Sequence, residues 1–265
     1  MTSETIVRRL AMGAAGGLLL AASCFQPMLA ARKDVDYAAL DAQVSRLQAV
    51  GASQSAIDAV FAAHGLVRVD SGAGNEVTPF ASTSNDVTMG QPSVYEDTRF
   101  SYFVATASFQ WHHNCSNPFY YKNQCVAKEC LFWDCGGPDG FGVRLNRVVN
   151  EIKTSFYTHD TDGNQTTWVN PETLNETGAG WIEQDSLSNG RYNWDGGNVY
   201  YMFDLATSCT RGTAYKAYSR LDHSWSNTNI NGFGISATGF NVSWSSEGAR
   251  WTATNAVTTY WYPCG

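Results

Sequence analysis

One stretch of this chain combines a histidine, two carboxylates and a glycine within six residues, at positions 159–164 (HDTDGN). Closely spaced carboxylates beside a glycine resemble the start of a calcium-binding loop. Counted from Asp160, the glycine stands fourth rather than sixth and position twelve is Pro171, so the EF-hand spacing fails. Asp-Gly and Gly-Asn pairs are also frequent in tight turns. The pattern favours a turn, and the alternative is an irregular calcium site at Asp160, Asp162 and Asn164.

A second acid–base candidate is the neighbouring pair Asp222 and His223. A carboxylate beside a histidine can orient it or hold its charge for acid–base catalysis. Neighbouring residues on a strand point to opposite faces, so each of these two side chains needs partners from elsewhere in the fold. We therefore favour a buried polar histidine at position 223. The alternative is a hydrolase in which His159, His223 and carboxylates converge in one cleft.

Motifs of common hydrolases are missing from the chain. It contains no G-x-S-x-G nucleophile elbow and no H-E-x-x-H zinc helix. A pair of glycosidase carboxylates depends on separation in space, which the sequence does not reveal. Five acidic residues could supply such a pair: Glu151, Glu172, Glu176, Glu183 and Asp204.

The tryptophans suggest a binding surface. An indole can fill a core, and it can also form a platform for a sugar ring or a partner surface. Binding residues concentrate on loops that a rigid scaffold holds in place. Four tryptophans have Gly-, Asp- and Asn-rich surroundings, so we expect them to be exposed and to bind a ligand together with His159, Asp160 and Asp162: Trp133, Trp168, Trp181 and Trp194.

The first 31 residues have the pattern of a cleaved signal peptide. Arg8 and Arg9 precede an apolar run that is too short to span a bilayer, and small residues follow at Ala30 and Ala31. A lipid anchor at Cys24 is the alternative. Cleavage leaves 15 basic and 23 acidic residues, a net charge of −8, which argues against nucleic acid and anionic membranes as partners.

The cysteine count agrees with export. Seven cysteines are present, and removal of the signal peptide leaves an even number, typical of three disulfides in an exported protein. No C-x-x-C pair occurs, which argues against structural zinc. We expect Cys209 to pair with Cys264, because this bond would hold the last strand in place. The other four are expected to pair among themselves: Cys115, Cys125, Cys130 and Cys135.

Hydrophobic periodicity divides the mature chain. Apolar residues at three- and four-residue steps predict a helical hairpin over 32–69, either a brace or a removable propeptide. A Gly-, Ser- and Asn-rich stretch predicts a linker over 70–98. Alternating patterns over 99–265 predict a mainly β domain, an antiparallel β-sandwich or barrel, whose last three strands form a meander. Three of these patterns place apolar residues on one face of a strand: Phe103, Ala105, Ala107, Phe109 and Trp111; Phe141, Val143 and Leu145; and Val199, Tyr201, Phe203 and Leu205.

The stretch 218–228 (YSRLDHSWSNT), followed by GFGI at 232–235 and the Ser/Thr-rich C-terminal strands, resembles uncharacterised secreted bacterial β-sandwich-like proteins. The resemblance covers the last third of the chain and implies export and a β fold, but no activity. The sequence thus favours a secreted non-catalytic β-sandwich that binds an extracellular ligand, such as a glycan, through loop aromatics. The alternatives are a secreted hydrolase with an unrecognised carboxylate and histidine site, and a membrane-acting secreted protein.

Overall fold

The computed structural model describes residues 34–70, 73–77, 87–111, 137–188, 191–206, 211–224, 228–246, 250–255 and 257–263. All of them belong to one compact unit, residues 34–265. Two helices come first and antiparallel strands follow, so the predicted mainly β fold class is confirmed. No helix within the described ranges is long and apolar enough to cross a membrane. The expected signal peptide, with Cys24, lies outside these ranges.

The two helices form the predicted hairpin. They are α1 (Tyr37–Ala49) and α2 (Gln54–Ala63). The side chain of Ser53 caps α2 by accepting a hydrogen bond from a backbone N–H in the first turn. Gly51 and Gly65 follow the two helices at φ values of 65° and 84°, a left-handed conformation that glycine adopts without strain.

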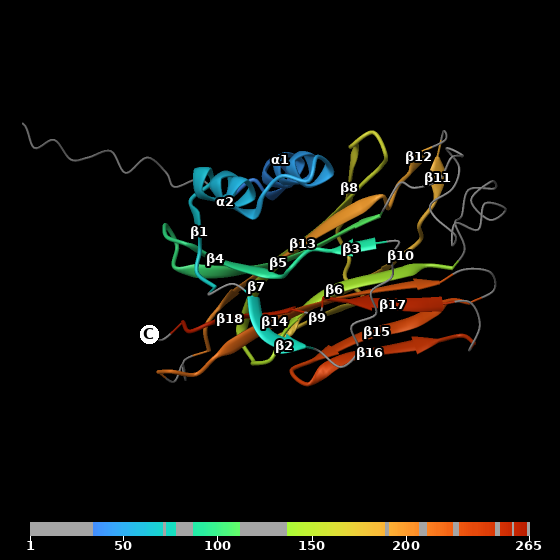
Figure 1. The fold of residues 1–265 in the computed structure, drawn as a ribbon. Coiled ribbons are helices and arrows are strands. Elements are labelled where there is room, and N and C mark those ends of the chain that lie inside the picture. The colour runs from blue at the N-terminus through green and yellow to red at the C-terminus, as the bar shows by residue number, and fades with distance from the viewer. Residues whose placement is uncertain are drawn as a thin grey trace, which may run out of the picture. The chain divides into compact units, whose positions relative to one another are not determined.

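Sheet A lies directly below the hairpin (Figure 1). Its central strands β5, β13 and β7 pair over long antiparallel registers. The strand order is β1 (Leu66–Arg68), β4 (Ser93–Asp97), β5 (Tyr102–Trp111), β13 (Gly196–Asp204), β7 (Asn150–His159) and β8 (Gln165–Trp168), and β3 (Val87–Met89) also pairs with β5.

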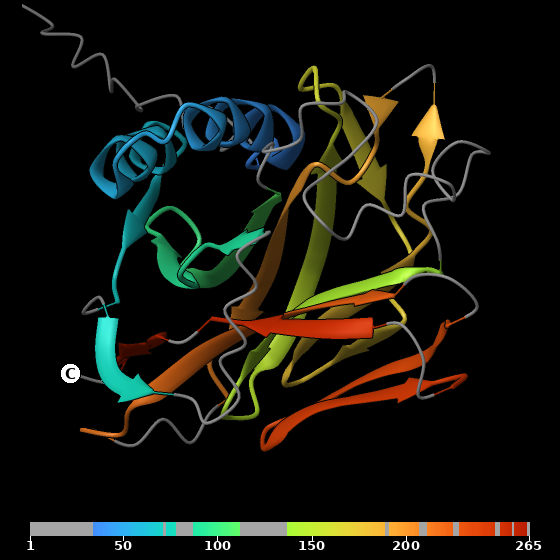
Figure 2. The same cartoon turned by 45° about the vertical axis from the view of Figure 1, so that its right-hand side comes forward.

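Sheet B forms the next layer (Figure 2). Its order is β2 (Ala73–Val77), β18 (Val257–Trp261), β14 (Tyr215–Ser224), β6 (Asp139–Leu145), β10 (Gly178–Glu183) and β9 (Thr173–Asn175), and β17 (Arg250–Thr254) also pairs with β14. Two small ribbons complete the fold. They are β11 (Leu187–Ser188) with β12 (Arg191–Tyr192), and β15 (Ile230–Ser236) with β16 (Gly239–Trp244).

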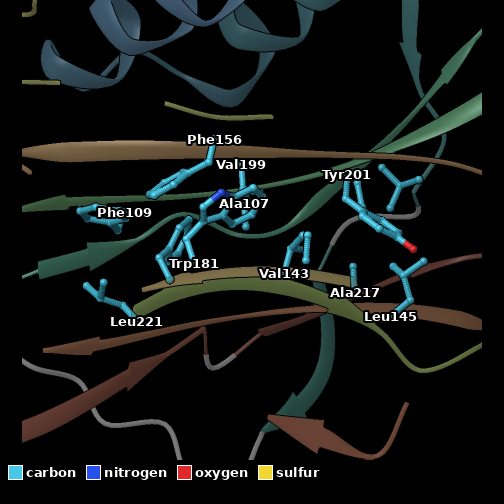
Figure 3. Packing of buried hydrophobic residues seen from close by; sticks show 14 of the residues in the cluster. Ala107, Phe109, Val143, Leu145, Phe156, Trp181, Val199, Tyr201, Ala217 and Leu221 are labelled. Atoms are coloured by element: carbon cyan, nitrogen blue, oxygen red, sulfur yellow. The ribbon is translucent and has the colours of Figure 1, made fainter. Parts of the chain in front are cut away.

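The main core fills the space between the two sheets. Figure 3 shows Phe109, Phe156 and Val199 pointing from sheet A toward Trp181 and Val143 of sheet B. Ring centroids of Phe156 and Trp181 lie 5.1 Å apart, so aromatic packing joins the sheets directly. The inward face predicted for β5 is buried, as its two-residue period requires: Phe103, Ala105, Ala107, Phe109 and Trp111. The described strands thus form a sandwich of two separate sheets rather than a barrel.

The β15–β16 hairpin adds a layer on the outer face of sheet B. Its Phe233 side chain is 1% exposed and lies over three glycines of β6 and β10. A Cβ atom at Gly140, Gly142 or Gly180 would lie 2.6, 2.9 or 2.5 Å from the Phe233 ring. Glycine is needed at these positions because the aromatic ring approaches the sheet backbone so closely.

The range 70–98, expected to be a linker, contains the three strands β2, β3 and β4. The strand β4 pairs with β1 and β5, and its burial pattern lacks alternation. Val94 faces the core between the sheets, whereas Tyr95 packs under the helical hairpin. A strand that is covered on both faces shows no two-residue period, which is why the sequence pattern missed it.

The prediction of a C-terminal meander is wrong beyond its first hairpin. The strands β15 and β16 pair with each other, but β17 and β18 pair with β14 instead. Ala253 of β17 lies opposite Leu221 of β14, and both are buried in the main core. The last strands therefore pair within sheet B, because their apolar side chains can pack in the main core there. Pairing with β16 would leave these side chains exposed.

Candidate functional site

A buried carboxylate on the first helix joins the helical hairpin to sheet A. Asp41 is 0% exposed, although it lies on α1. Its Oδ2 atom accepts hydrogen bonds from His159 Nε2 at 2.7 Å and from Gln165 Nε2 at 2.6 Å. Its Oδ1 atom accepts one from the Tyr200 hydroxyl at 2.9 Å. We call Asp41, His159, Gln165 and Tyr200 the hairpin clasp.

Two of the three side chains that donate to Asp41, Gln165 and Tyr200, are neutral. Burial and the charge of Asp41 raise the pKa of Tyr200 well above its usual value, so its hydroxyl remains a donor. Ser45 Oγ lies 2.9 Å from His159 Nε2 and accepts a hydrogen bond from Asn198 Nδ2 at 3.1 Å. A fully buried carboxylate is stable only when such hydrogen bonds replace its lost hydration. The arrangement is suited to fixing the hairpin in place.

A cavity of about 460 Å³ lies beside the clasp, between the hairpin and strands β3, β4, β5 and β13. Its exposed lining residues lie around the turn between the helices and on β3: Ala49, Gly51, Gln54 and Thr88. The rings of Phe61, Tyr95 and Tyr200 are buried at its inner end. A volume of this size is typical of small-molecule sites, which range over about 300–1,000 Å³.

Neutral polar groups line much of this cavity. None of the described residues around it carries a formal charge at neutral pH. Gln48 Nε2 donates to Asn198 Oδ1 at 3.0 Å, and Asn198 bonds in turn to Ser45 beside His159 of the clasp. A side-chain amide has two donor hydrogens and an acceptor oxygen, so one bond leaves it capacity for a ligand. The amides and hydroxyls of the lining are Gln48, Gln54, Gln91, Gln110, Asn198, Thr88, Ser93, Thr106, Ser108, Tyr95 and Tyr200.

A second group of ionisable side chains meets at one end of sheet B. Asp139 begins β6, His223 lies at the end of β14, and Asp185 follows β10. These three strands are antiparallel neighbours, so the three positions fall at the same end of the sheet. Asp139 and Asp185 are 0% exposed and His223 is 4% exposed. We call these three residues the end cluster.

Within the end cluster, His223 Nδ1 lies 2.8 Å from both carboxylate oxygens of Asp139. The Tyr192 hydroxyl donates to Asp185 Oδ2 at 2.7 Å, and one potential ligand atom from each cluster residue lies within 4.8 Å of the others. Burial raises the pKa of Asp139, although His223 opposes this shift. Burial and the charge of Asp139 raise the pKa of Asp185 even further above its usual value.

The stretch 159–164 forms a turn, as its composition favoured. Asp160 Oδ1 accepts hydrogen bonds from the backbone N–H groups of Asp162 and Asn164 at 2.9 and 2.8 Å. Its Oδ2 accepts one from Asn164 Nδ2 at 2.8 Å, and Gly163 has a φ value of 81°. Both oxygens of Asp160 thus stabilise the connection between β7 and β8, while His159 points away into the hairpin clasp.

The expected exposure of the loop tryptophans is wrong for two of them. Trp181 and Trp194 are 0% exposed and pack in the main core. The glycines around Trp181 contact Phe233 instead of marking a loop. Trp168 is half-buried in β8, where its Nε1–H donates to Thr158 Oγ1 at 2.8 Å. The other predicted residues lie outside the described ranges: Trp133, Cys115, Cys125, Cys130, Cys135, Cys209 and Cys264.

The histidines of the hydrolase alternative do not share a site. His159 bonds to Asp41 on the hairpin side of sheet A, whereas His223 bonds to Asp139 at the end of sheet B. The prediction that Asp222 and His223 face apart is confirmed, because Asp222 instead accepts hydrogen bonds from Arg220 at 2.6 and 2.8 Å.

Sequence reasoning missed Asp139, Asp185 and Asp41. A signal for the first was present, since Phe141, Val143 and Leu145 were placed on one face of a strand and Asp139 continues their period. No local signal marked Asp185, because it lies beyond the end of β10. Asp41 stands among apolar helix positions, but its partners lie more than 100 residues away.

Comparison with known proteins gives no family for this chain. No family model matches it, and no curated protein matches it. One similar structure comes from a study of pH-induced modulation of Streptococcus parasanguinis adhesion by Fap1 fimbriae, with 9% identity, 75% of this chain and 88% of that chain covered, and a TM-score of 0.27. Another comes from a study of AvmM, which catalyses macrocyclization in alchivemycin A biosynthesis, with 6% identity, 64% and 88% coverage, and a TM-score of 0.23. At these values neither likeness assigns a family or an activity, and the resemblance to secreted bacterial β-sandwich-like proteins is not confirmed.

Proposed function

We propose that this chain is a secreted, non-catalytic β-sandwich protein that binds a neutral glycan in the cavity under its helical hairpin. The observation that carries the proposal is the lining of the cavity, where amides and hydroxyls stand beside apolar side chains and no charged side chain occurs among the described residues. Sugar hydroxyls both donate and accept hydrogen bonds, and amides and hydroxyls do the same. Export is supported by the signal-like segment and the even number of remaining cysteines.

The hairpin enters this proposal as a brace rather than a propeptide. Val44, Gln48, Ile57 and Phe61 of the two helices form one wall of the cavity. Removal of the hairpin would therefore remove this wall of the site as well as the partners of His159 and Tyr200. The ligand would contact this wall and the outer face of β5 and β13, instead of the loop tryptophans expected from the sequence.

The test is binding of the full chain to an array of neutral and acidic glycans, followed by calorimetry with the best neutral ligand. Replacement Gln48→Leu keeps the side-chain size but removes its polar atoms, and we expect about tenfold weaker binding, as for the loss of one good hydrogen bond. Gln43→Leu on the exposed face of the same helix is the matched control and should bind normally. Lack of binding to every neutral glycan, or equal losses in the two variants, would contradict the proposal.

A further inference from the structure

The end cluster holds two buried carboxyl groups beside one histidine. Asp139 and Asp185 are both 0% exposed, and His223 is the only basic residue among the three. A protonated imidazole cancels one carboxylate charge and leaves the other. The hairpin clasp, in contrast, places only one carboxylate beside its histidine, and neutral donors make its other hydrogen bonds. Neutral donors also reach Asp185, namely the Tyr192 hydroxyl and Gln184 Nε2, but they leave two carboxyl groups for one histidine. An unbalanced buried carboxylate is costly unless it is protonated or coordinates a cation.

The strand pattern explains why these groups face one another. Leu221 and Phe141 point into the core between the sheets. His223 lies two residues after Leu221, and Asp139 lies two residues before Phe141 on the antiparallel neighbour. Alternation therefore directs both of them inward as well. Asp185 arrives from the segment after β10, and the Tyr192 hydroxyl fixes one of its oxygens. Three side chains of the types that bind metals thus meet at one end of the main core.

We propose that Asp139, Asp185 and His223 bind one divalent metal ion of the zinc type. Two ionised carboxylates and a neutral imidazole carry a charge of −2, which a divalent ion cancels. Zinc accepts such donors, because histidine nitrogen and aspartate oxygen both bind it at about 2.0–2.2 Å. Calcium and magnesium prefer oxygen ligands alone, so the imidazole favours a first-row transition ion.

The distances within the cluster are close to those of a ligand shell. Two ligands about 2.1 Å from one ion lie about 3.0–3.4 Å apart at right or tetrahedral angles. His223 Nδ1 lies 2.8 Å from each oxygen of Asp139, and one such atom of Asp185 is within 4.8 Å. The backbone N–H of Ser224 donates to Asp139 Oδ1 at 3.1 Å, and the Tyr192 hydroxyl holds Asp185. Hydrogen bonds of this kind orient metal ligands in proteins.

The experiment is calorimetric titration of the chelator-treated full chain with Zn²⁺. We expect one ion per chain, and an affinity at least about 100-fold lower for Asp185→Asn and His223→Asn, since loss even of a hydrogen-bond partner outside the ligand set costs about 10–100-fold. His159→Asn is the matched control, because His159 is the other buried histidine bonded to an aspartate, and it should bind zinc normally. Wild-type affinity in Asp185→Asn would overturn the proposal.

Cobalt gives a readout that separates this site from the cysteines. The Co²⁺-loaded wild-type chain is expected to show d–d absorption without thiolate-to-metal charge transfer, because the proposed ligands are oxygen and nitrogen. A thiolate band would place the ion at cysteines and overturn the assignment. Wild-type protein that takes up neither Zn²⁺ nor Co²⁺ would also overturn it, and this result does not depend on whether the variants fold.

Discussion

The hairpin clasp and the end cluster both contain a buried histidine bonded to a buried aspartate, yet they differ in what surrounds the pair. In the clasp, Asp41 also accepts hydrogen bonds from Tyr200 and Gln165, both neutral. In the end cluster, the neighbour of the Asp139–His223 pair is a second buried carboxylate, Asp185. The same two residue types therefore fix a helix in one place and form a set of potential metal ligands in the other.

This difference shows that the charge balance around a histidine–aspartate pair, rather than the pair itself, indicates its role. Removal of one partner from a balanced buried pair leaves an uncompensated group and destabilises the fold. Where two carboxylates are buried beside one histidine and no cation is bound, removal of one carboxylate relieves repulsion and stabilises the fold. The two sites consequently predict mutational effects of opposite sign.

The largest effect is expected at the clasp. Replacement Asp41→Ala leaves His159, Tyr200 and Gln165 without their buried acceptor, so we expect the free energy of unfolding to fall by about 3–5 kcal/mol in urea titrations. Asp36→Ala on the same helix is the control. Asp36 caps α1 by accepting a hydrogen bond from the Ala39 N–H at 3.1 Å, and its loss should cost about 1 kcal/mol. Equal losses in the two variants would show that the clasp contributes no more than a helix cap.

A second carboxylate introduced into the clasp should reproduce the imbalance of the end cluster. Ser45→Asp places it beside His159 and Asp41, because Ser45 Oγ lies 2.9 Å from His159 Nε2. Position 45 is half-buried, and we expect a loss of about 2 kcal/mol in the presence of a chelator. Ser45→Asn adds nearly the same volume without charge and should cost less. If the two variants lose equal stability, crowding rather than charge is responsible.

The smallest effect is a gain of stability at the end cluster. The pKa of Asp185 is raised in the folded chain. Its contribution to the free energy of unfolding is therefore complete below the pKa of the unfolded chain, about 3.9, and is lost as the pH rises through the pKa of the folded chain. With chelator at pH 8, Asp185→Asn should therefore raise the free energy of unfolding by about 1 kcal/mol.

Excess Zn²⁺ should make the wild-type chain more stable than Asp185→Asn, because only the wild-type chain keeps the complete ligand set and gains stability from the bound ion. Thermal unfolding of both proteins, with chelator and with Zn²⁺, measures the reversal. A wild-type chain that is more stable than Asp185→Asn in chelator would show that Asp185 is already balanced by its hydrogen bonds.

Local patterns predicted a large part of the fold. The steps of three and four residues predicted the helical hairpin that α1 and α2 form. Alternation identified the inward faces of β5, β6 and β13. These predictions succeeded because the direction of a side chain on a helix or strand depends only on neighbouring backbone geometry.

The candidate sites needed more than local patterns. Glycine beside Trp181 suggested a loop, but Gly180 is there to accommodate Phe233 from another strand. The strand β4 lost its alternation because the helical hairpin covers its outer face. Exposure depends on which layer covers a segment, and that layer comes from a distant part of the chain.

The sequence by itself determined that Asp222 and His223 point apart, that residues 159–164 turn, and that the chain is mainly β, because each of these follows from residue type and backbone period over a few positions. Only the tertiary structure decided the partner of each buried histidine. His159 meets Asp41 across 118 positions of sequence, and His223 meets Asp139 across 84. A buried carboxylate needs hydrogen-bond donors, and tertiary packing decides which side chains are close enough to donate. A local sequence pattern does not show which residues from distant parts of the chain come close together.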